Sequence, residues 1–234
     1  MHGTGGSRRE RLRGYGSFSR RQGSADGSSP MRYVSLLLHL YQPPTQDIRL
    51  VRRIDSECYT PLANVLAETG ARVGVNINYS LTEQLAVIDS PSLRSLASAD
   101  GIEFTDSGAY HPIFPLIEQS DIVRQLSLNS EGNRRLLGDA YSPSGVFPPE
   151  MAYWPGLPGI IERQGYRWTV TDDLPWDFEH GEVPFDTVPA VDGVAVLLRS
   201  NFWSNRISFH GDSAFLPAPP SRQVPGPSPA AHPP

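Results

Sequence analysis

The sequence predicts an α/β protein built on a parallel sheet. Short apolar segments alternate with longer amphipathic ones, the pattern of strands joined by crossover helices. Chemically versatile polar side chains follow several of the apolar segments, and sites of parallel α/β folds form at the carboxyl ends of strands. About five or six strands are recognisable, whereas a closed barrel needs roughly eight. We therefore expect a partial barrel.

The expected strands are short and mostly apolar. Residues 32–40 are nearly all apolar and stop before Pro43 and Pro44, which is typical of a fully buried strand. Residues 72–78 place Val or Ile at every second position. Further strands are expected at residues 102–104, 145–147, 168–170 and 194–198.

The expected helices lie between these strands. Residues 54–69 carry an apolar stripe, and Gly70 is a stop signal. The sequence Ser80-Leu81-Thr82-Glu83 resembles a capping box and predicts a helix that runs to about residue 88. Further helices are expected at residues 121–137 and 157–164.

The two ends of the chain differ from this core in composition. Residues 1–30 are rich in Gly, Ser and Arg and contain too few aliphatic side chains to offset the entropy of ordering. Met31, which opens the apolar region, is a candidate natural start. The alternating pattern stops abruptly before Pro-rich residues 213–234, which indicates a truncated or frame-shifted C-terminus. We expect two disordered tails around a partial barrel domain at residues 31–212.

The composition excludes several classes of protein. A net charge of −5 provides no footprint for nucleic acid or an anionic membrane. Cys58 is the only cysteine, so neither an internal disulfide nor a thiolate metal cluster can form. No apolar run approaches the ~20 residues that span a bilayer, and no signal-peptide h-region is present. We expect a cytoplasmic protein that requires no metal or cofactor.

Glu150 is the first candidate for chemistry. It lies in the apolar and aromatic stretch 145–154, and burying a carboxylate there costs free energy unless it is paired. Such carboxylates concentrate at functional sites. The structural alternative is a turn whose lone glutamate points to water.

Two histidines and two aspartates complete the set of candidates. His39 follows the first strand, and His111 lies in a proline-rich loop. Each histidine is a candidate to bind a hydroxyl group, and for each the alternative is a purely structural role. Asp172 and Asp173 end another strand, and Asp173 is also a candidate N-cap. A retaining glycosidase needs two carboxylates about 5–5.5 Å apart, so Glu150 with one of these aspartates fits that chemistry.

Four segments resemble the motifs of family 57 glycoside hydrolases, a retaining α-glucan-active group on an incomplete, TIM-like (β/α)7 barrel. Residues 39–43 resemble the first motif, His-x-His-Gln-Pro, with Tyr41 in place of the second histidine. The second, third and fourth motifs are matched by residues 108–116, 146–153 and 170–173. The resemblance covers about residues 31–212 and lacks the fifth motif.

The resemblance implies a role for each matched residue. Glu150 falls on the nucleophile, and Asp172 falls on the general acid/base, with Asp173 as the fallback. The implied substrate contacts, together with aromatic stacking candidates, are His39, Tyr41, Gln42, Tyr110, His111, Tyr153 and Trp154. The implied function is a retaining glycoside hydrolase or transglycosylase that acts on an α-glucan or oligosaccharide.

Two alternatives remain at this point. The first is a truncated or degenerate fragment that binds glucan without turnover. The second is a metal-dependent polysaccharide deacetylase, which the Asp172-Asp173 pair fits loosely, although the sequence contains no His-x3-His spacing.

Overall fold

The computed structural model describes residues 34–184 and 186–210. The tails predicted for residues 1–30 and 213–234 lie outside these residues, as does the candidate start Met31. The chain divides into two compact units, which are described separately below.

The first unit, Met1–Arg199, contains the strands of the described residues. They form two sheets, ordered β1-β2-β3 and β4-β5-β7-β6, and every neighbouring pair is parallel except the β6–β7 hairpin. A parallel bridge between Asp106, just after β3, and Val146 of β4 connects the two sheets. The parallel strands thus follow one another in chain order, as in a barrel. Their bounds are β1 Leu37–Leu40, β2 Val73–Ile77, β3 Ile102–Thr105, β4 Gly145–Val146, β5 Trp168–Asp172, β6 Ala190–Val191 and β7 Val194–Arg199.

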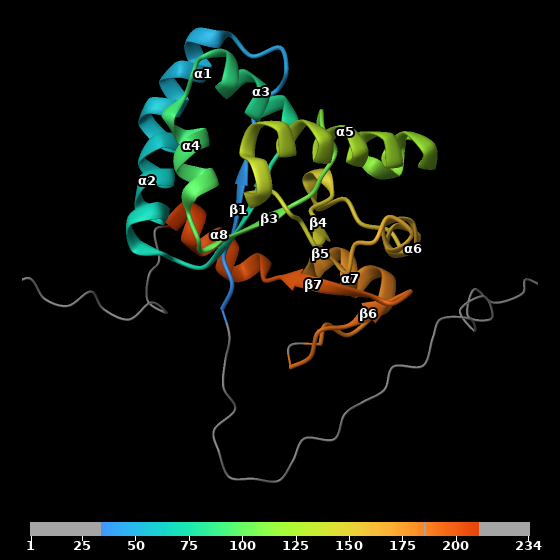
Figure 1. The fold of residues 1–234 in the computed structure, drawn as a ribbon. Helices are drawn as coiled ribbons and strands as arrows, with labels where there is room; N and C mark the ends of the chain where they lie inside the picture. The colour runs from blue at the N-terminus through green and yellow to red at the C-terminus, as the bar shows by residue number, and fades with distance from the viewer. Residues whose placement is uncertain (1–33, 185, 211–234) are drawn as a thin grey trace, which may run out of the picture. The chain divides into compact units, whose positions relative to one another are not determined.

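Helices join and flank these strands. Figure 1 shows α1, α2 and α4 beside the first sheet, and α6 and α7 beside the second. The helices of this unit are α1 Ile48–Ile54, α2 Thr60–Thr69, α3 Tyr79–Val87, α4 Pro91–Ser98, α5 Gln119–Leu137, α6 Leu157–Glu162 and α7 Asp173–His180. The alternation of strands and helices confirms the predicted α/β class.

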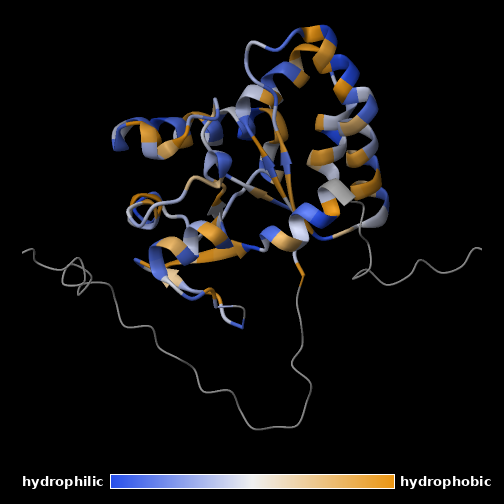
Figure 2. Ribbon diagram, turned by 180° about the vertical axis from the view of Figure 1, so that it is seen from behind, coloured by the Kyte–Doolittle hydropathy of each residue, from blue (hydrophilic) through white to orange (hydrophobic). Residues whose placement is uncertain are grey.

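Two apolar cores hold the helices to the sheets. One lies behind β1–β3 and includes Val75, Ile77 and Leu81, all fully buried. The other lies behind β4–β7 and includes Val146 and Ile161. Figure 2 shows the strands as mostly hydrophobic segments between helices of mixed hydropathy. Truncating one such side chain to Ala typically costs about 2–5 kcal/mol, so these cores set the position of the strand ends.

Several elements differ from the sequence prediction. The first helical segment begins at Ile48 rather than residue 54 and contains a π-helical turn, Asp55–Tyr59. Helix α4 was not predicted, although Ser90 caps it and Pro91 occupies its first turn. The predicted capping box is wrong, because Asn78 is the N-cap and the Ser80 hydroxyl, inside α3, donates to the Gln42 carbonyl.

The second unit, Ser200–Pro234, contributes helix α8 (Asn201–His210) to the described residues. Among all the described residues, no helix is both long and apolar enough to cross a membrane.

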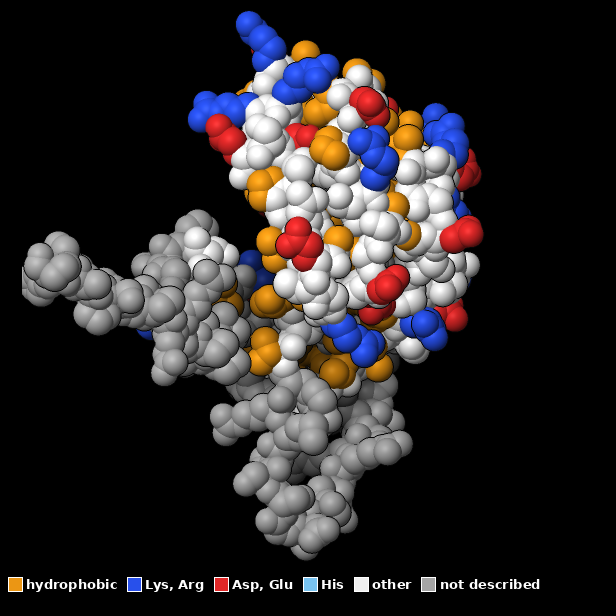
Figure 3. All heavy atoms as spheres, turned by 60° about the vertical axis from the view of Figure 1, so that its left-hand side comes forward, with side chains coloured by type: hydrophobic (Ala, Val, Ile, Leu, Met, Phe, Trp, Pro, Cys, Tyr) orange, Lys and Arg blue, Asp and Glu red, His pale blue; other side chains and the backbone are white. Residues whose placement is uncertain are grey.

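Charges are mixed on the visible surface of the first unit. Figure 3 shows arginine and acidic side chains interspersed with isolated apolar ones on the face that carries α1 and α2. The first unit also contains three exposed ion pairs, such as Arg53–Glu57 at 2.9 Å. Such pairs contribute little to stability, and their mixed signs produce no extended field of one charge on that face.

Candidate active site

A row of polar side chains crosses three neighbouring strands at their carboxyl ends. The register pairs His39 of β1 with Asn76 of β2, and Asn76 with Thr105 of β3. His39 Nδ1 lies 2.7 Å from Asn76 Oδ1, and Asn76 Nδ2 donates to Thr105 Oγ1 at 3.0 Å. Residues paired in register share a face of the sheet, so these three side chains mark one face, here called the inner face.

The second sheet continues this inner face. Phe147 follows Val146, the bridge partner of Asp106, so it turns to the same side as Thr105. Its ring stacks on His39 with centroids 5.0 Å apart, which agrees with that placement. Along β5 the same alternation places Asp172 on the inner face, beside its register partner Arg199.

Glu150 reaches the site from the loop after β4. Its Oε1 lies 3.1 Å from His111 Nε2. The Glu150 side chain is 69% exposed, whereas the His111 side chain is only 5% exposed. The Glu150 carboxylate faces solvent and is therefore accessible to a ligand. Its partner His111 is buried, so the contact orients one of the two carboxylate oxygens.

The backbone at this contact is strained. Glu150 has φ 58° and ψ 16°, Met151 has φ 49° and His111 has φ 59°. The left-handed region is unfavourable for residues with a Cβ atom, by about 1–2 kcal/mol each. Such strain concentrates at functional sites, because it survives only where the surroundings impose it. Sequence reasoning missed this signal, since none of the three is a glycine or an asparagine.

Stacked rings surround the two histidines. The Tyr41 ring lies 4.1 Å from His111, and the His39 and His111 centroids are 5.3 Å apart. Burial lowers the pKa of His39, against the opposing effects of its bond to Asn76 and of Glu150. Burial also lowers the pKa of His111, as does its neighbour His39, while the Glu150 charge acts the other way. Both imidazoles are therefore biased toward the neutral form, and burial followed by the Glu150 charge raises the pKa of Tyr41.

Asp172 has a different environment from Glu150. Its Oδ1 accepts from the Leu174 backbone N–H at 3.1 Å, so Asp172 is the N-cap of α7. Its Oδ2 accepts from Arg199 Nε at 3.0 Å and from Arg199 Nη2 at 2.5 Å. The capping role considered for Asp173 thus belongs to Asp172, and Asp173 is the first residue of the helix. Thr171 connects this strand end to the Glu150 loop, because its hydroxyl donates to the Met151 carbonyl at 3.4 Å.

The remaining predicted contact residues have other neighbours. Gln42 Nε2 donates to the Tyr59 hydroxyl at 3.0 Å, which braces the loop after β1. Tyr110 packs its ring edge-on against Tyr79, and burial followed by the Glu83 charge raises its pKa.

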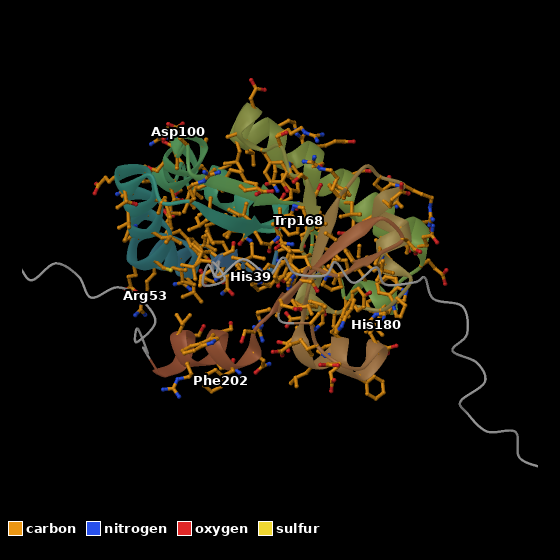
Figure 4. All side chains as sticks on the ribbon, turned by 90° about the horizontal axis from the view of Figure 1, so that it is seen from below. His39, Arg53, Asp100, Trp168, His180 and Phe202 are labelled. Atoms are coloured by element: carbon orange, nitrogen blue, oxygen red, sulfur yellow. The ribbon has the colours of Figure 1, made fainter. Side chains whose placement is uncertain are left out.

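Tyr153 and Trp154 belong mainly to the second core. The Tyr153 hydroxyl lies 3.3 Å from His180 Nε2, and burial raises the pKa of Tyr153 to about 12. Figure 4 shows His180 well to one side of His39 in the view from below. Trp154 lines an open hollow of about 420 Å³ with Pro115 and other, mostly apolar residues. The structure thus brings His39, Tyr41, His111 and Glu150 together. Tyr153 and Trp154 mainly pack against apolar side chains of the second core.

Asp106 is a buried carboxylate that sequence reasoning missed. It lies just beyond β3, on the face opposite Thr105, and accepts from Ser130 and Tyr166 hydroxyls at very short range. Asn129 Nδ2 also donates to it, at 2.7 Å. Desolvation raises the pKa of Asp106, although all these donors oppose the shift. These partners lie in α5 and in the loop that carries Tyr166, on the outer face of the sheet. Asp106 therefore connects that helix to that loop and does not face the site.

In the part of the chain that the structure describes, no group of three or more His, Cys, Asp or Glu side chains is arranged to hold a metal ion.

Comparison with known families gives a match over most of the chain. The model of glycosyl hydrolase family 57 matches residues 32–226. An alpha-amylase from Pyrococcus horikoshii is 29% identical over 142 residues, which cover 58% of this chain and 22% of the relative. Alpha-amylase 1 from Dictyoglomus thermophilum is 27% identical over 146 residues, covering 60% and 21%. The matched part therefore spans about a fifth of the length of these curated relatives.

Solved structures show the same fold. The 4-alpha-glucanotransferase from Thermococcus litoralis aligns with a TM-score of 0.66 at 21% identity, covering 74% of this chain and 29% of that one. A GH57-type branching enzyme from Pyrococcus horikoshii aligns with a TM-score of 0.59 at 16% identity, covering 73% and 47%. These likenesses confirm the predicted partial (β/α) barrel-type fold.

Proposed function

The chain belongs to glycosyl hydrolase family 57, and from this premise we propose that it carries the catalytic residues of a retaining glycoside hydrolase or transglycosylase that acts on α-linked glucans. The observation that carries the proposal is the Glu150–His111 contact, a solvent-facing carboxylate held on a strained turn at the carboxyl end of a parallel sheet. The alpha-amylase, glucanotransferase and branching enzyme among its relatives support the substrate class.

Glu150 is the proposed nucleophile. In the first step one carboxylate oxygen attacks the anomeric carbon and forms a glycosyl-enzyme, while the glycosidic oxygen leaves with a proton. Within the described part of the chain, one donor at Oε1, His111 Nε2, orients the carboxylate without surrounding it. The other oxygen, Oε2, remains available for the attack.

Asp172 is the proposed general acid and base, with Asp173 as the fallback. Asp172 is the carboxylate of β5 that shares the inner face with His39 and Phe147. The guanidinium of Arg199 stabilises its ionised form, which is the form that deprotonates water or an acceptor hydroxyl in the second step. The first step requires the protonated carboxyl, so this ion pair has to loosen when substrate binds.

The aromatic and imidazole side chains would form the wall of the subsite. Tyr41 stacks on His111, and Phe147 stacks on His39, so the two histidines lie within a layer of flat rings. Rings of this kind offer apolar faces to a sugar, and the imidazole nitrogens offer hydrogen bonds to its hydroxyls.

Incubation with maltooligosaccharides and glycogen tests the proposal, with product anomers followed by NMR. We expect new oligosaccharides or reducing ends, formed first as the α-anomer. A cooperatively folded protein that binds these glucans without turnover would instead support the fragment alternative. Initial release of the β-anomer would exclude the double-displacement mechanism.

A leaving-group series tests the role of Asp172. If Asp172 protonates the leaving oxygen, Asp172→Asn loses about 10²–10⁴-fold in rate on maltooligosaccharides. It should lose far less in kcat/KM on α-glucosyl fluoride, because kcat/KM reports the first step and fluoride leaves without a proton. Equal losses in kcat/KM on both substrates would contradict the acid role, and Asp173→Asn is the matched comparison.

A further inference from the structure

Asn76 occupies the centre of the polar row on the inner face. Asn76 and Thr105 are fully buried, while His39 is exposed to solvent. Asn76 uses both ends of its amide, since Nδ2 donates to Thr105 Oγ1 and Oδ1 lies 2.7 Å from His39 Nδ1. In this arrangement the Thr105 hydroxyl accepts from Nδ2, and the amide oxygen is the end that meets the imidazole.

This orientation determines the tautomer of His39. An amide oxygen can only accept a hydrogen bond, so the short contact requires a proton on His39 Nδ1. In a neutral ring the other nitrogen, Nε2, then carries a lone pair. Nδ1 faces the buried Asn76, so the solvent-accessible edge of the ring is the one that carries Nε2.

The geometry of His111 calls for the opposite tautomer. Its Nε2 contacts a carboxylate oxygen of Glu150, which also can only accept, so the proton lies on Nε2. Its Nδ1 is buried and has no hydrogen-bond partner among the described residues. A bare lone pair there is consistent with a neutral ring whose single proton points at Glu150.

We propose that Asn76 is a positioning residue that holds His39 as the Nδ1–H tautomer, so that His39 Nε2 accepts a hydrogen bond from a sugar hydroxyl while His111 donates to Glu150. The two stacked imidazoles thereby divide the acceptor and donor roles. The identity of the ligand rests on the proposed function, whereas the tautomers do not. The titratable groups that face His39 are His111, Tyr41 and Glu150.

Long-range ¹H–¹⁵N NMR of the histidine rings at neutral pH tests this assignment on the full chain. We expect His39 with a protonated Nδ1 and a pyridine-like Nε2, and His111 with the reverse pattern. In Asn76→Asp the carboxylate accepts from Nδ1 and favours the imidazolium, so the titration of His39 should move up by about 1–3 pH units. That variant should lose the Nε2 acceptor at neutral pH and with it about tenfold or more in kcat/KM.

Thr105→Val and Thr105→Ser form a matched pair that leaves both site histidines in place. Valine removes the acceptor that orients the Asn76 amide, so the His39 signals should shift toward a tautomer mixture. Serine keeps the hydroxyl and should restore the wild-type pattern. This pair keeps the test decisive if Asn76→Asp does not fold, as judged by circular dichroism.

A proton on His39 Nε2 in the wild type overturns the proposal, and so does an unchanged His39 pattern in the folded Thr105→Val variant. These readouts are independent of turnover. A chain with the expected tautomers but no action on glucans would refute the proposed function alone, and an active chain with the wrong tautomers would refute this inference alone.

Discussion

Two carboxylates, Asp106 and Glu150, lie close to the carboxyl ends of neighbouring strands and have opposite environments. Asp106 is fully buried and accepts hydrogen bonds from hydroxyl, amide and backbone donors. The Glu150 side chain is 69% exposed and accepts from one donor among the described residues, His111. Glu150 and its partner His111 both have left-handed backbones, whereas Asp106 is not among the residues with positive φ.

The difference separates a structural carboxylate from the proposed nucleophile. Several donors stabilise Asp106 and connect α5 to the loop that carries Tyr166, so its lone pairs are occupied. Glu150 is oriented at one oxygen and keeps the other accessible, which a nucleophile requires. Burial alone, the first indicator of an unusual carboxylate, points to Asp106 and would mislead.

Glu150→Gln should have the largest effect. The amide cannot form the glycosyl-enzyme, so we expect turnover of maltooligosaccharides to fall by about a thousandfold or more. The melting temperature should barely change, because the side chain is exposed. Exposed Glu118→Gln is the control for kcat and stability, and a Glu150→Gln variant that retains turnover would refute the nucleophile assignment.

Asp106→Asn should show the reverse pattern. The amide group replaces one acceptor oxygen, so hydroxyl donors from Ser130 and Tyr166 lose their partner in a buried site. We expect a loss of about 1–3 kcal/mol in the free energy of unfolding, measured by urea titration. Asp139→Asn, at an exposed position, is the matched control. If Asp106→Asn leaves stability intact but abolishes turnover, the comparison drawn above is wrong.

The titration of His111 should make a smaller contribution, visible in how the free energy of unfolding depends on pH. Burial lowers its pKa below the ordinary value of about 6.5, so as pH falls through this region the unfolded chain takes up the proton first. The contribution of His111 to stability is therefore complete above about pH 6.5 and is lost as pH falls through the folded pKa. Each proton of difference changes the free energy of unfolding by at most about 1.4 kcal/mol per pH unit.

Melting temperatures measured between pH 8 and pH 5 check this expectation. His111→Asn should flatten the decline on the acid side, because asparagine tolerates the left-handed backbone and does not titrate there. His180, whose pKa burial also lowers, remains in both proteins and cancels in the difference, whereas His39 lies beside His111 and its titration is followed separately by NMR in both proteins. An identical slope for both proteins would show that His111 is not held neutral by folding.

Local patterns in the sequence predicted most of the secondary structure and placed several candidate residues at strand ends. The apolar segments around Val75 and Val170 became parallel strands, and His39 and Asp172 lie at strand ends as expected. Helix α4 was missed although its start signals, Ser90 and Pro91, were present. The predicted capping box failed because tertiary contacts, such as Ser80 to Gln42, used its side chains.

The sequence by itself determined the α/β class and the candidates Glu150, His39 and His111, because periodicity, chain order and residue type are local properties. Only the tertiary structure decided which groups meet. Strand register brought Asn76 to His39, and packing imposed the left-handed backbone at Glu150 and His111. The donors around Asp106 also come from segments distant in the chain, and no local pattern encodes such contacts, because they arise only when separate elements pack together.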